Sequence, residues 1–241
     1  MKWFEKIFKN VLYYPGCLMK FVAKDINENY KRILRKCGID FIQLSEIEVC
    51  CGSPLINAGL TETAKSLANK NFKIFKQHRV KEIITPCPAC FKTFSQDYPK
   101  FVENWDIEVR HVTQVIKDAI SEGKLKIREI ERTVTFHDPC YLGRYCNVYE
   151  EPREILRKIG CEIKEMEMNK EHSLCCGAGG GLQSNFPEIA NSIAKERIEQ
   201  ALKTKAKILV TACPLCYLHL KRNSKKIEVK ELSELVIESI Y

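Results

Sequence analysis

The sequence lacks any long apolar run. No window approaches the roughly 18 consecutive apolar residues of a membrane-spanning helix, and no apolar segment with a small-residue cleavage site opens the chain. We therefore expect a cytoplasmic protein without a transmembrane segment, peripheral at a membrane at most through a partner. Residues 1–12 form a short amphipathic stretch, for which docking on a membrane surface, contact with a partner and packing on the sheet stay open.

Motifs for nucleotides and nucleic acids are also missing. The glycine-rich segment 177–181 has neither the GxxxxGK[ST] nor the GxGxxG frame of a phosphate-binding loop. The net charge is +8, but the lysines are scattered along expected helices rather than clustered, so we expect no nucleic-acid partner. With 45% hydrophobic and 29% charged residues, the composition is that of a globular protein and excludes a disordered chain.

Cysteine, in contrast, is abundant: the 241 residues include 13 cysteines. Disulfide-rich scaffolds occur in small secreted domains, and neither the expected compartment nor the odd number of cysteines fits such a scaffold. The cysteine content therefore favours metal binding or redox chemistry.

Ten of the cysteines form the same pattern twice. A single cysteine is followed by a Cys-Cys-Gly triplet and then by a Cys-Pro-x-Cys motif. In the first half, 32 residues separate the single cysteine from the triplet and 35 separate the second cysteine of the triplet from the motif; in the second half these numbers are 34 and 36. The first cysteine group is Cys17, Cys50, Cys51, Cys87 and Cys90, and the second cysteine group is Cys140, Cys175, Cys176, Cys213 and Cys216. The segment Ile33-Leu34-Arg35-Lys36 also recurs as Ile155-Leu156-Arg157-Lys158. The repeat predicts a duplication with two cysteine-rich domains, residues 1–125 and 126–241.

Expected strands and helices alternate along each half. The hydrophobic patterns predict strands over residues 11–14, 39–44, 80–85, 107–111, 134–137, 162–166, 208–211 and 227–229. They predict helices over residues 24–36, 61–78, 113–121, 152–159, 187–203 and 231–239. We therefore expect an α/β fold of two tandem, duplicated, doubly wound (Rossmann-like) parallel-sheet domains related by a pseudo-two-fold. The single cysteine, the Cys-Cys-Gly triplet and the Cys-Pro-x-Cys motif of each half then follow the carboxyl ends of strands, where open parallel sheets bind ligands.

The number and adjacency of the cysteines indicate what they bind. A mononuclear zinc site needs four ligands, whereas each group offers five thiols. Two adjacent cysteines can hardly serve one small ion, because their side chains diverge from Cα atoms about 3.8 Å apart. A thiolate-held iron–sulfur cluster is wide enough to accept both. Zinc in one group, and buried packing cysteines or a vicinal disulfide, remain as alternatives.

The pattern resembles the CCG-type cysteine-rich domains of heterodisulfide reductase subunits and of iron–sulfur subunits of lactate, glycolate and glycerol-3-phosphate oxidoreductases. The resemblance covers residues 11–236, and its finer matches are His137-Asp138-Pro139-Cys140-Tyr141-Leu142-Gly143-Arg144, Glu151-Pro152-Arg153-Glu154-Ile155-Leu156 and Leu174-Cys175-Cys176-Gly177-Ala178-Gly179-Gly180-Gly181. It implies a non-cubane [4Fe–4S] cluster on each complete group, with zinc in the first group as the alternative. It further implies an iron–sulfur oxidoreductase subunit whose two clusters face a shared cavity where a small-molecule disulfide or similar carrier is reduced.

The finer matches look most like the D-type branch of the heterodisulfide reductase family, and two departures from that branch affect this expectation. The sequence contains no ferredoxin-like CxxCxxCxxxCP run, so we expect electrons from a flavoprotein or a ferredoxin-like iron–sulfur partner. The alternative function is a non-catalytic electron-transfer subunit of a lactate-, glycolate- or glycerol-3-phosphate-type flavoprotein complex. Cys146 also stands where relatives carry asparagine, and its role stays open.

Reductive cleavage of a disulfide needs two electrons and two protons. His137, three residues before Cys140, is the expected catalytic proton donor because histidine titrates near neutral pH. A strand cap or a hydrogen bond to a cluster sulfur is the alternative for His137. Cys37 and Cys161, beside glycines at helix ends, are expected to be packing residues.

Overall fold

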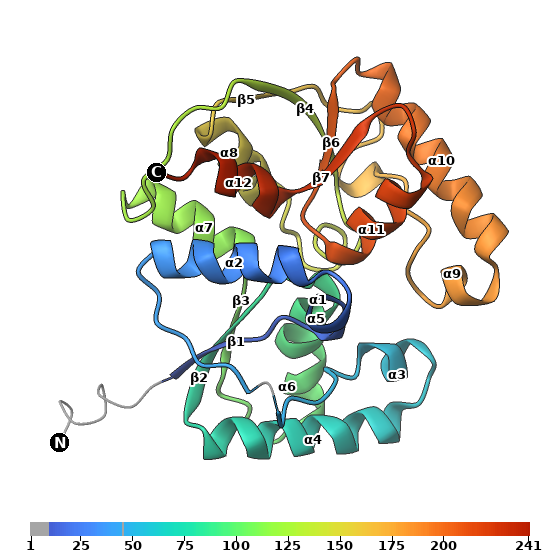
Figure 1. Cartoon of the computed structure of the whole chain (residues 1–241). Coiled ribbons are helices and arrows are strands. Elements are labelled where there is room, and N and C mark those ends of the chain that lie inside the picture. The colour runs from blue at the N-terminus through green and yellow to red at the C-terminus, as the bar shows by residue number, and fades with distance from the viewer. Residues whose placement is uncertain (1–9, 45) are drawn as a thin grey trace.

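The computed structural model describes residues 10–44 and 46–241, so residues 1–9 of the amphipathic stretch lie outside them. Within these residues the strands form two parallel sheets (Figure 1). The first sheet has the order β1-β2-β3, with β1 at Asn10–Tyr13, β2 at Val80–Thr85 and β3 at Glu108–His111. The second has the order β5-β4-β6-β7, with β4 at Arg132–His137, β5 at Cys161–Ile163, β6 at Ile208–Thr211 and β7 at Glu228–Glu231.

Helices follow the strands in both halves. The helices of the first half are α1 (Cys17–Phe21), α2 (Lys24–Lys36), α3 (Ser53–Asn57), α4 (Thr61–Gln77), α5 (Pro88–Lys92), the π-helix η2 (Thr93–Asp97), α6 (Tyr98–Phe101) and α7 (Val112–Ser121). Those of the second half are α8 (Glu150–Lys158), the 3-10 helix η3 (Lys170–His172), α9 (Leu182–Asn185), α10 (Pro187–Lys203), α11 (Pro214–Asn223) and α12 (Leu232–Ser239). Parallel strands with intervening helices confirm the α/β class.

The sequence was misread at two edge strands. Residues 39–44 do not form the expected strand: Ile42 makes a single isolated bridge to Leu12, in which its N–H donates to the carbonyl of Val11 and its carbonyl accepts from the N–H of Tyr13. The expected strand at 162–166 is shorter and ends at Ile163. Both segments pair on one side only, and their apolar side chains mimic a longer strand. The pseudo-two-fold relation and the domain bounds 1–125 and 126–241 stay predictions.

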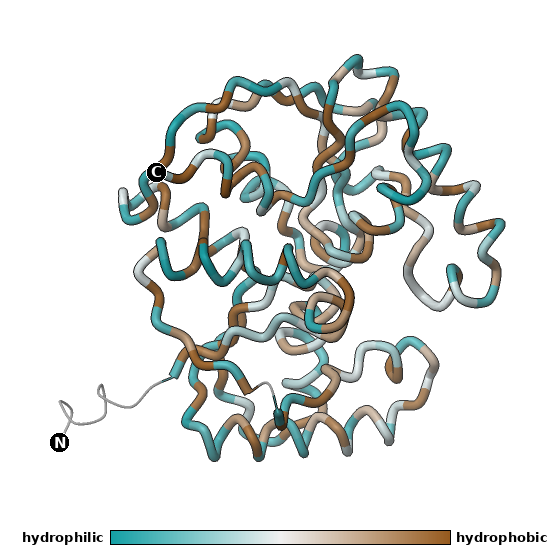
Figure 2. Tube along the Cα trace, viewed as in Figure 1, coloured by the Kyte–Doolittle hydropathy of each residue, from teal (hydrophilic) through white to brown (hydrophobic). Residues whose placement is uncertain are grey.

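The helices α2, α7, α8 and α12 lie between the two sheets (Figure 1). The first-half helices α2 and α7 pack against the second-half helices α12 and α8, respectively. One buried hydrophobic cluster runs through both halves, and a second cluster lies in the first half around Phe75 and Phe94. Along α4 and α10, brown and teal segments alternate in Figure 2, as expected for helices with one apolar face. In the described part of the chain, none of the helices is long and apolar enough to span a bilayer.

A buried hydrogen bond joins the two halves within this layer. The hydroxyl of Tyr30 on α2 donates to a carboxylate oxygen of Glu231, the residue that caps α12, at 2.5 Å. Both side chains are fully buried. Glu231 also accepts hydrogen bonds from the backbone and the hydroxyl of Ser233.

Candidate metal centres

The first cysteine group comes together at one edge of the first sheet. Cys17 opens α1 after β1, Cys87 caps α5 directly after β2, and Cys90 lies one turn into α5. The sulfurs of Cys51 and Cys90 are 3.3 Å apart. The thiols of Cys17 and Cys50 interact electrostatically with that of Cys51, and the thiol of Cys87 with that of Cys90, so the five cysteines lie at the same edge of the sheet.

The second cysteine group has the same arrangement. Cys213 caps α11 directly after β6, and the sulfurs of Cys176 and Cys216 are 3.1 Å apart. Cys140 and Cys175 are hydrogen-bonded neighbours that also interact with Cys176. The helices α1 and α11, which begin at the two groups, pack against each other. All 13 cysteines are free thiols, so the vicinal disulfide considered from the sequence does not occur here.

The glycine of each Cys-Cys-Gly triplet turns its backbone toward a sulfur. Gly52 and Gly177 have φ angles of +92° and +87°. Their N–H groups donate to the sulfurs of Cys50 and Cys175, each at 3.4 Å. A Cβ atom at Gly177 would lie 2.7 Å from the carbonyl oxygen of Ala190, so only glycine fits. Backbone donors of this kind stabilise the thiolate form of cysteine, which is the form that binds a metal.

Crowding splits the pKa values of the thiols. A hydrogen bond from Cys140 is the main reason that the pKa of Cys175 is lowered to about 2. A hydrogen bond from Cys50 likewise lowers the pKa of Cys51. Their neighbours Cys90 and Cys176 have raised pKa values, because they serve as donors to these thiolates. Five sulfurs this close cannot all ionise without a cation among them, and such donor sets bind soft metal ions.

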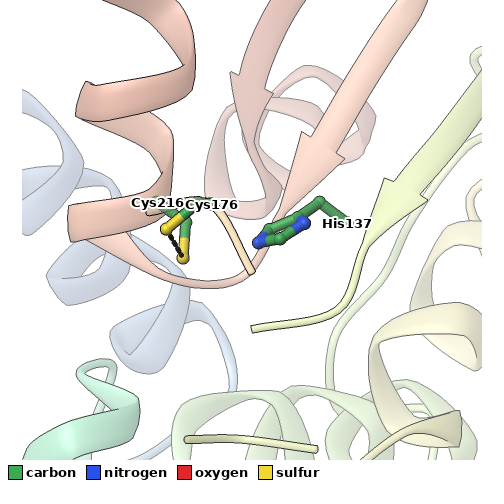
Figure 3. A group of neighbouring side chains, drawn as sticks. All are labelled: His137, Cys176 and Cys216. Carbon is green, nitrogen blue, oxygen red and sulfur yellow. Dashed lines mark hydrogen bonds between the residues drawn. The ribbon is translucent and has the colours of Figure 1, made fainter. Parts of the chain in front are cut away.

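His137 lies at the end of β4 and faces the second cysteine group. One of its ring nitrogens and the sulfurs of Cys176 and Cys216 all lie within 4.8 Å of one another. Figure 3 shows the ring nitrogen further from the backbone directed at the two sulfurs. That atom, Nε2, is buried and has no hydrogen-bond partner among the described residues. Burial lowers the pKa of His137 to about 3, so the ring is neutral at pH 7.

Arg197 of α10 fixes the orientation of this ring. Its Nε donates to Nδ1 of His137 at 3.0 Å. Its other nitrogens donate to the hydroxyl of Ser173, the carbonyl of Met168 and the side chain of Gln200. Since Nδ1 accepts a hydrogen bond, the neutral ring carries its proton on Nε2.

A buried ion-pair network holds the loop between His137 and Cys140. The guanidinium of Arg153 on α8 binds both carboxylate oxygens of Asp138, at 2.6 and 2.9 Å, and those of Glu165, at 2.7 and 3.0 Å. The second oxygen of Asp138 also accepts from the backbone N–H of Lys170 at 2.8 Å. Bidentate pairs of this kind fix geometry, so the network sets the path of the chain into Cys140.

The segment after Cys140 contacts the first half. The Tyr141 hydroxyl donates to the side chain of Asn57 at 2.9 Å, and Gln96 donates to the carbonyl of Tyr145 at 2.6 Å. The sulfur of Cys146 lies 3.8 Å from Nε2 of Gln96 and belongs to neither cysteine group. Burial raises its pKa to about 12, so it is a protonated thiol.

Sequence reasoning missed the arginines. Arg197 stands within the alanine-rich buried stripe of α10 that includes Ala190, Ala194 and Ala201. Arg153 likewise lies among the buried residues of α8. A cation on the apolar face of an amphipathic helix was the available signal, because a buried charge requires a partner. Cys37 and Cys161 lie in the hydrophobic cluster, in keeping with the expected packing role.

Comparison with known proteins identifies the repeated pattern. A family model described as "Cysteine-rich domain" (CCG) matches residues 11–95 and again residues 134–221. One subunit of the dihydromethanophenazine:CoB–CoM heterodisulfide reductase of Methanosarcina acetivorans is 38% identical, over 96% of this chain and 59% of the relative.

Two further relatives are more distant. One subunit of the fumarate reductase (CoM/CoB) of Methanothermobacter marburgensis is 34% identical, over 93% of this chain and 45% of the relative. The EtfAB:quinone oxidoreductase of Syntrophomonas wolfei is 33% identical, over 93% of this chain and 32% of the relative. The chain thus spans less than two thirds of each of these proteins.

Proposed function

Because the chain belongs to the CCG cysteine-rich domain family and its relatives are iron–sulfur oxidoreductase subunits, we propose that it reduces a small-molecule disulfide between two iron–sulfur clusters. The observation that supports this most is the presence of two complete five-thiol groups at adjoining sheet edges. We assign Cys17, Cys50, Cys51, Cys87 and Cys90 to the first cluster, and Cys140, Cys175, Cys176, Cys213 and Cys216 to the second.

The donor set fits a non-cubane [4Fe–4S] cluster better than zinc. Each group has one more thiol than a tetrahedral zinc site uses, and both adjacent cysteines of each triplet face the same group. Zinc in the first group is the alternative, since the same thiols could supply four ligands.

The clusters would supply one electron each, and the protein supplies the rest of the chemistry. A disulfide that accepts two electrons and two protons yields two thiols. His137 is our candidate for giving one of the two protons, and water would supply the other. Because the neutral ring holds a single proton, on Nε2 beside the second cysteine group, His137 can act as an acid only after it has taken up a second proton. The backbone N–H groups of Gly52 and Gly177 stabilise ligand thiolates throughout.

The choice of a disulfide follows the names of two relatives, a CoB–CoM heterodisulfide reductase subunit and a fumarate reductase (CoM/CoB) subunit. Electrons would come from a flavoprotein or a ferredoxin-like iron–sulfur partner. The second candidate is an electron-transfer subunit without a substrate of its own, which the likeness to the EtfAB:quinone oxidoreductase favours.

Metal analysis under anaerobic conditions tests the proposal. We expect about eight iron and eight acid-labile sulfide per chain if both groups hold four-iron clusters. About four iron with one zinc would assign zinc to one group, and zinc without sulfide would refute the redox function. Addition of a disulfide to the reduced protein should then change the paramagnetic resonance signal; a signal that responds only to a carrier protein would support the electron-transfer alternative.

A further inference from the structure

The two cysteine groups have matching positions with different residues around them. Three residues before the first cysteine of each group stands Tyr14 in the first half and His137 in the second. Ten residues into the matching 17-residue helices α4 and α10 stand Asn71 and Arg197. Because these residues occupy matching positions, they allow a direct comparison of the two groups.

Around the first group the hydrogen bonds of Tyr14 and Asn71 have neutral partners, and the nearby ionisable side chains Glu48 and Lys20 interact with each other with opposite sign. The Tyr14 hydroxyl donates to the carbonyl of Val49 at 2.7 Å, away from the sulfurs. Asn71 donates to the carbonyl of Cys50 at 3.0 Å and to the hydroxyl of Tyr98 at 2.8 Å. The nearby carboxyl of Glu48 interacts electrostatically with Cys51 and is an acid, with a pKa that burial raises to about 7.

Around the second group the contacts are cationic or directed at sulfur. Arg197 is fully buried, and all of its hydrogen-bond acceptors are neutral: His137, Ser173, Met168 and Gln200. Within residues 10–44 and 46–241 Arg197 makes no ion pair, whereas Arg153 is paired with two carboxylates. A buried cation requires anions nearby, and Arg197 interacts electrostatically with the carboxylate of Asp138, which is paired with Arg153, and with the thiol of Cys216 in the second cysteine group.

These contacts act on the electron affinity of a bound cluster. Positive charge and hydrogen bonds to the sulfurs favour the reduced state, because reduction adds negative charge to the cluster. Arg197 supplies the charge, and through its hydrogen bond to Nδ1 it aims the Nε2–H group of His137 at the sulfurs of Cys176 and Cys216.

We propose that the two centres are unequal: a cluster on the second cysteine group accepts an electron before one on the first, because the charge of Arg197 and the Nε2–H donor that it orients on His137 raise the reduction potential of that cluster. The inference rests on the proposed function, since it requires a cluster on each group. Arg197 and His137 are positioning residues in this assignment. The electron comes from the one-electron reductant of the assay, and each cluster gains one electron in its own step.

The test is a redox titration of the full chain with two loaded clusters, using dithionite and mediators and following visible absorbance and paramagnetic resonance. Two steps should appear, separated by at least a tenfold ratio of one-electron equilibrium constants, or about 59 mV. Arg197→Gln should shift the higher step downward by tenfold or more and leave the lower step in place. Arg197→Lys, which keeps the charge, should shift it less.

Arg222→Gln is the matched control. Arg222 is an exposed cation in the last turn of α11, the helix that begins at Cys213, so its removal changes the net charge equally and should move neither step. His137→Phe, which keeps Arg197, should lower the same step and abolish an exchangeable-proton coupling to the cluster. It therefore carries the test if Arg197→Gln does not load iron.

The outcomes separate this inference from the proposed function. Fewer than two clusters in the wild-type protein would count against the proposed function. Two clusters that titrate in one step, a lower step that moves in Arg197→Gln, or equal shifts in Arg197→Gln and Arg222→Gln would overturn the inequality alone.

Discussion

Gly16→Ala should displace the metal of the first cysteine group and spare the second. Gly16 has a φ of +77° and a ψ of 160°, a region that costs an alanine about 1–3 kcal/mol. The new Cβ would lie 3.2 Å from the sulfur of Cys90 and 3.4 Å from Cβ of Cys87. Contacts this short force a neighbour to move by a few tenths of an ångström, more than the roughly 0.2 Å that metal–ligand distances tolerate.

The assay is iron, sulfide and zinc analysis of the variant after anaerobic purification, with circular dichroism to verify the fold. We expect iron to fall from about eight to about four per chain. Gly38→Ala is the control: Gly38 has a φ of +74° but nothing within 4 Å of its Cβ position, so it shares the backbone strain without touching a sulfur. Equal iron in the two variants would refute the reasoning, and loss of all iron from a folded Gly16→Ala protein would show that the groups load together. If zinc fills the first group, zinc should be lost instead.

Three further predictions concern a ligand, an acid and an ion pair. Cys176→Ser should remove the iron of the second group, whereas Cys161→Ser should keep all iron and lower the free energy of unfolding by about 1–2 kcal/mol; equal iron in both would contradict the ligand assignment. Burial raises the pKa of Glu231 to about 7, so the folded protein binds this proton more tightly than the unfolded chain does. The resulting stabilisation, about 3 kcal/mol, is complete below the pKa of an unfolded glutamate and is lost as the pH rises through 7. Urea unfolding at pH 5 and pH 8 should show a smaller pH dependence in Glu231→Gln, and an unchanged dependence would reject the assignment. Arg153→Met leaves its carboxylate partners unpaired and should lower the free energy of unfolding by about 3–5 kcal/mol, while Arg157→Met at an exposed site of the same helix should cost less than about 0.5 kcal/mol.

The parts of the fold that follow from local patterns were predictable. The strand Val80–Thr85 and the helix Pro187–Lys203 have the bounds expected from the sequence. In both cases the pattern of apolar residues within the segment itself predicts the element. Residues 39–44 have a similar apolar run, yet only Ile42 pairs with β1. Whether an edge segment joins a sheet depends on tertiary contacts that the local pattern does not contain.

The same distinction applies to the site. The ten ligand candidates could be chosen from spacing alone, and the structure places Cys51 beside Cys90 and Cys176 beside Cys216; their role as ligands stays a prediction. The protonation state of His137 could not be predicted from the sequence, because it depends on Arg197, which is 60 residues away in sequence. Histidine was expected to titrate near neutral pH, but burial lowers its pKa to about 3, so its general-acid role stays a prediction that requires the ring to take up a second proton first.

The hydrogen bond between Tyr30 and Glu231 bears on how the protein is made. The two residues are 201 positions apart, so at synthesis rates of about 5–20 residues per second Tyr30 waits roughly 10–40 s for its partner to be translated. During that time the face of α2 that later packs on α12 is uncovered in the nascent chain. The cysteines of the first group all leave the ribosome before that wait is over. Iron that binds to these cysteines during that time would therefore bind before the second half of the protein has folded.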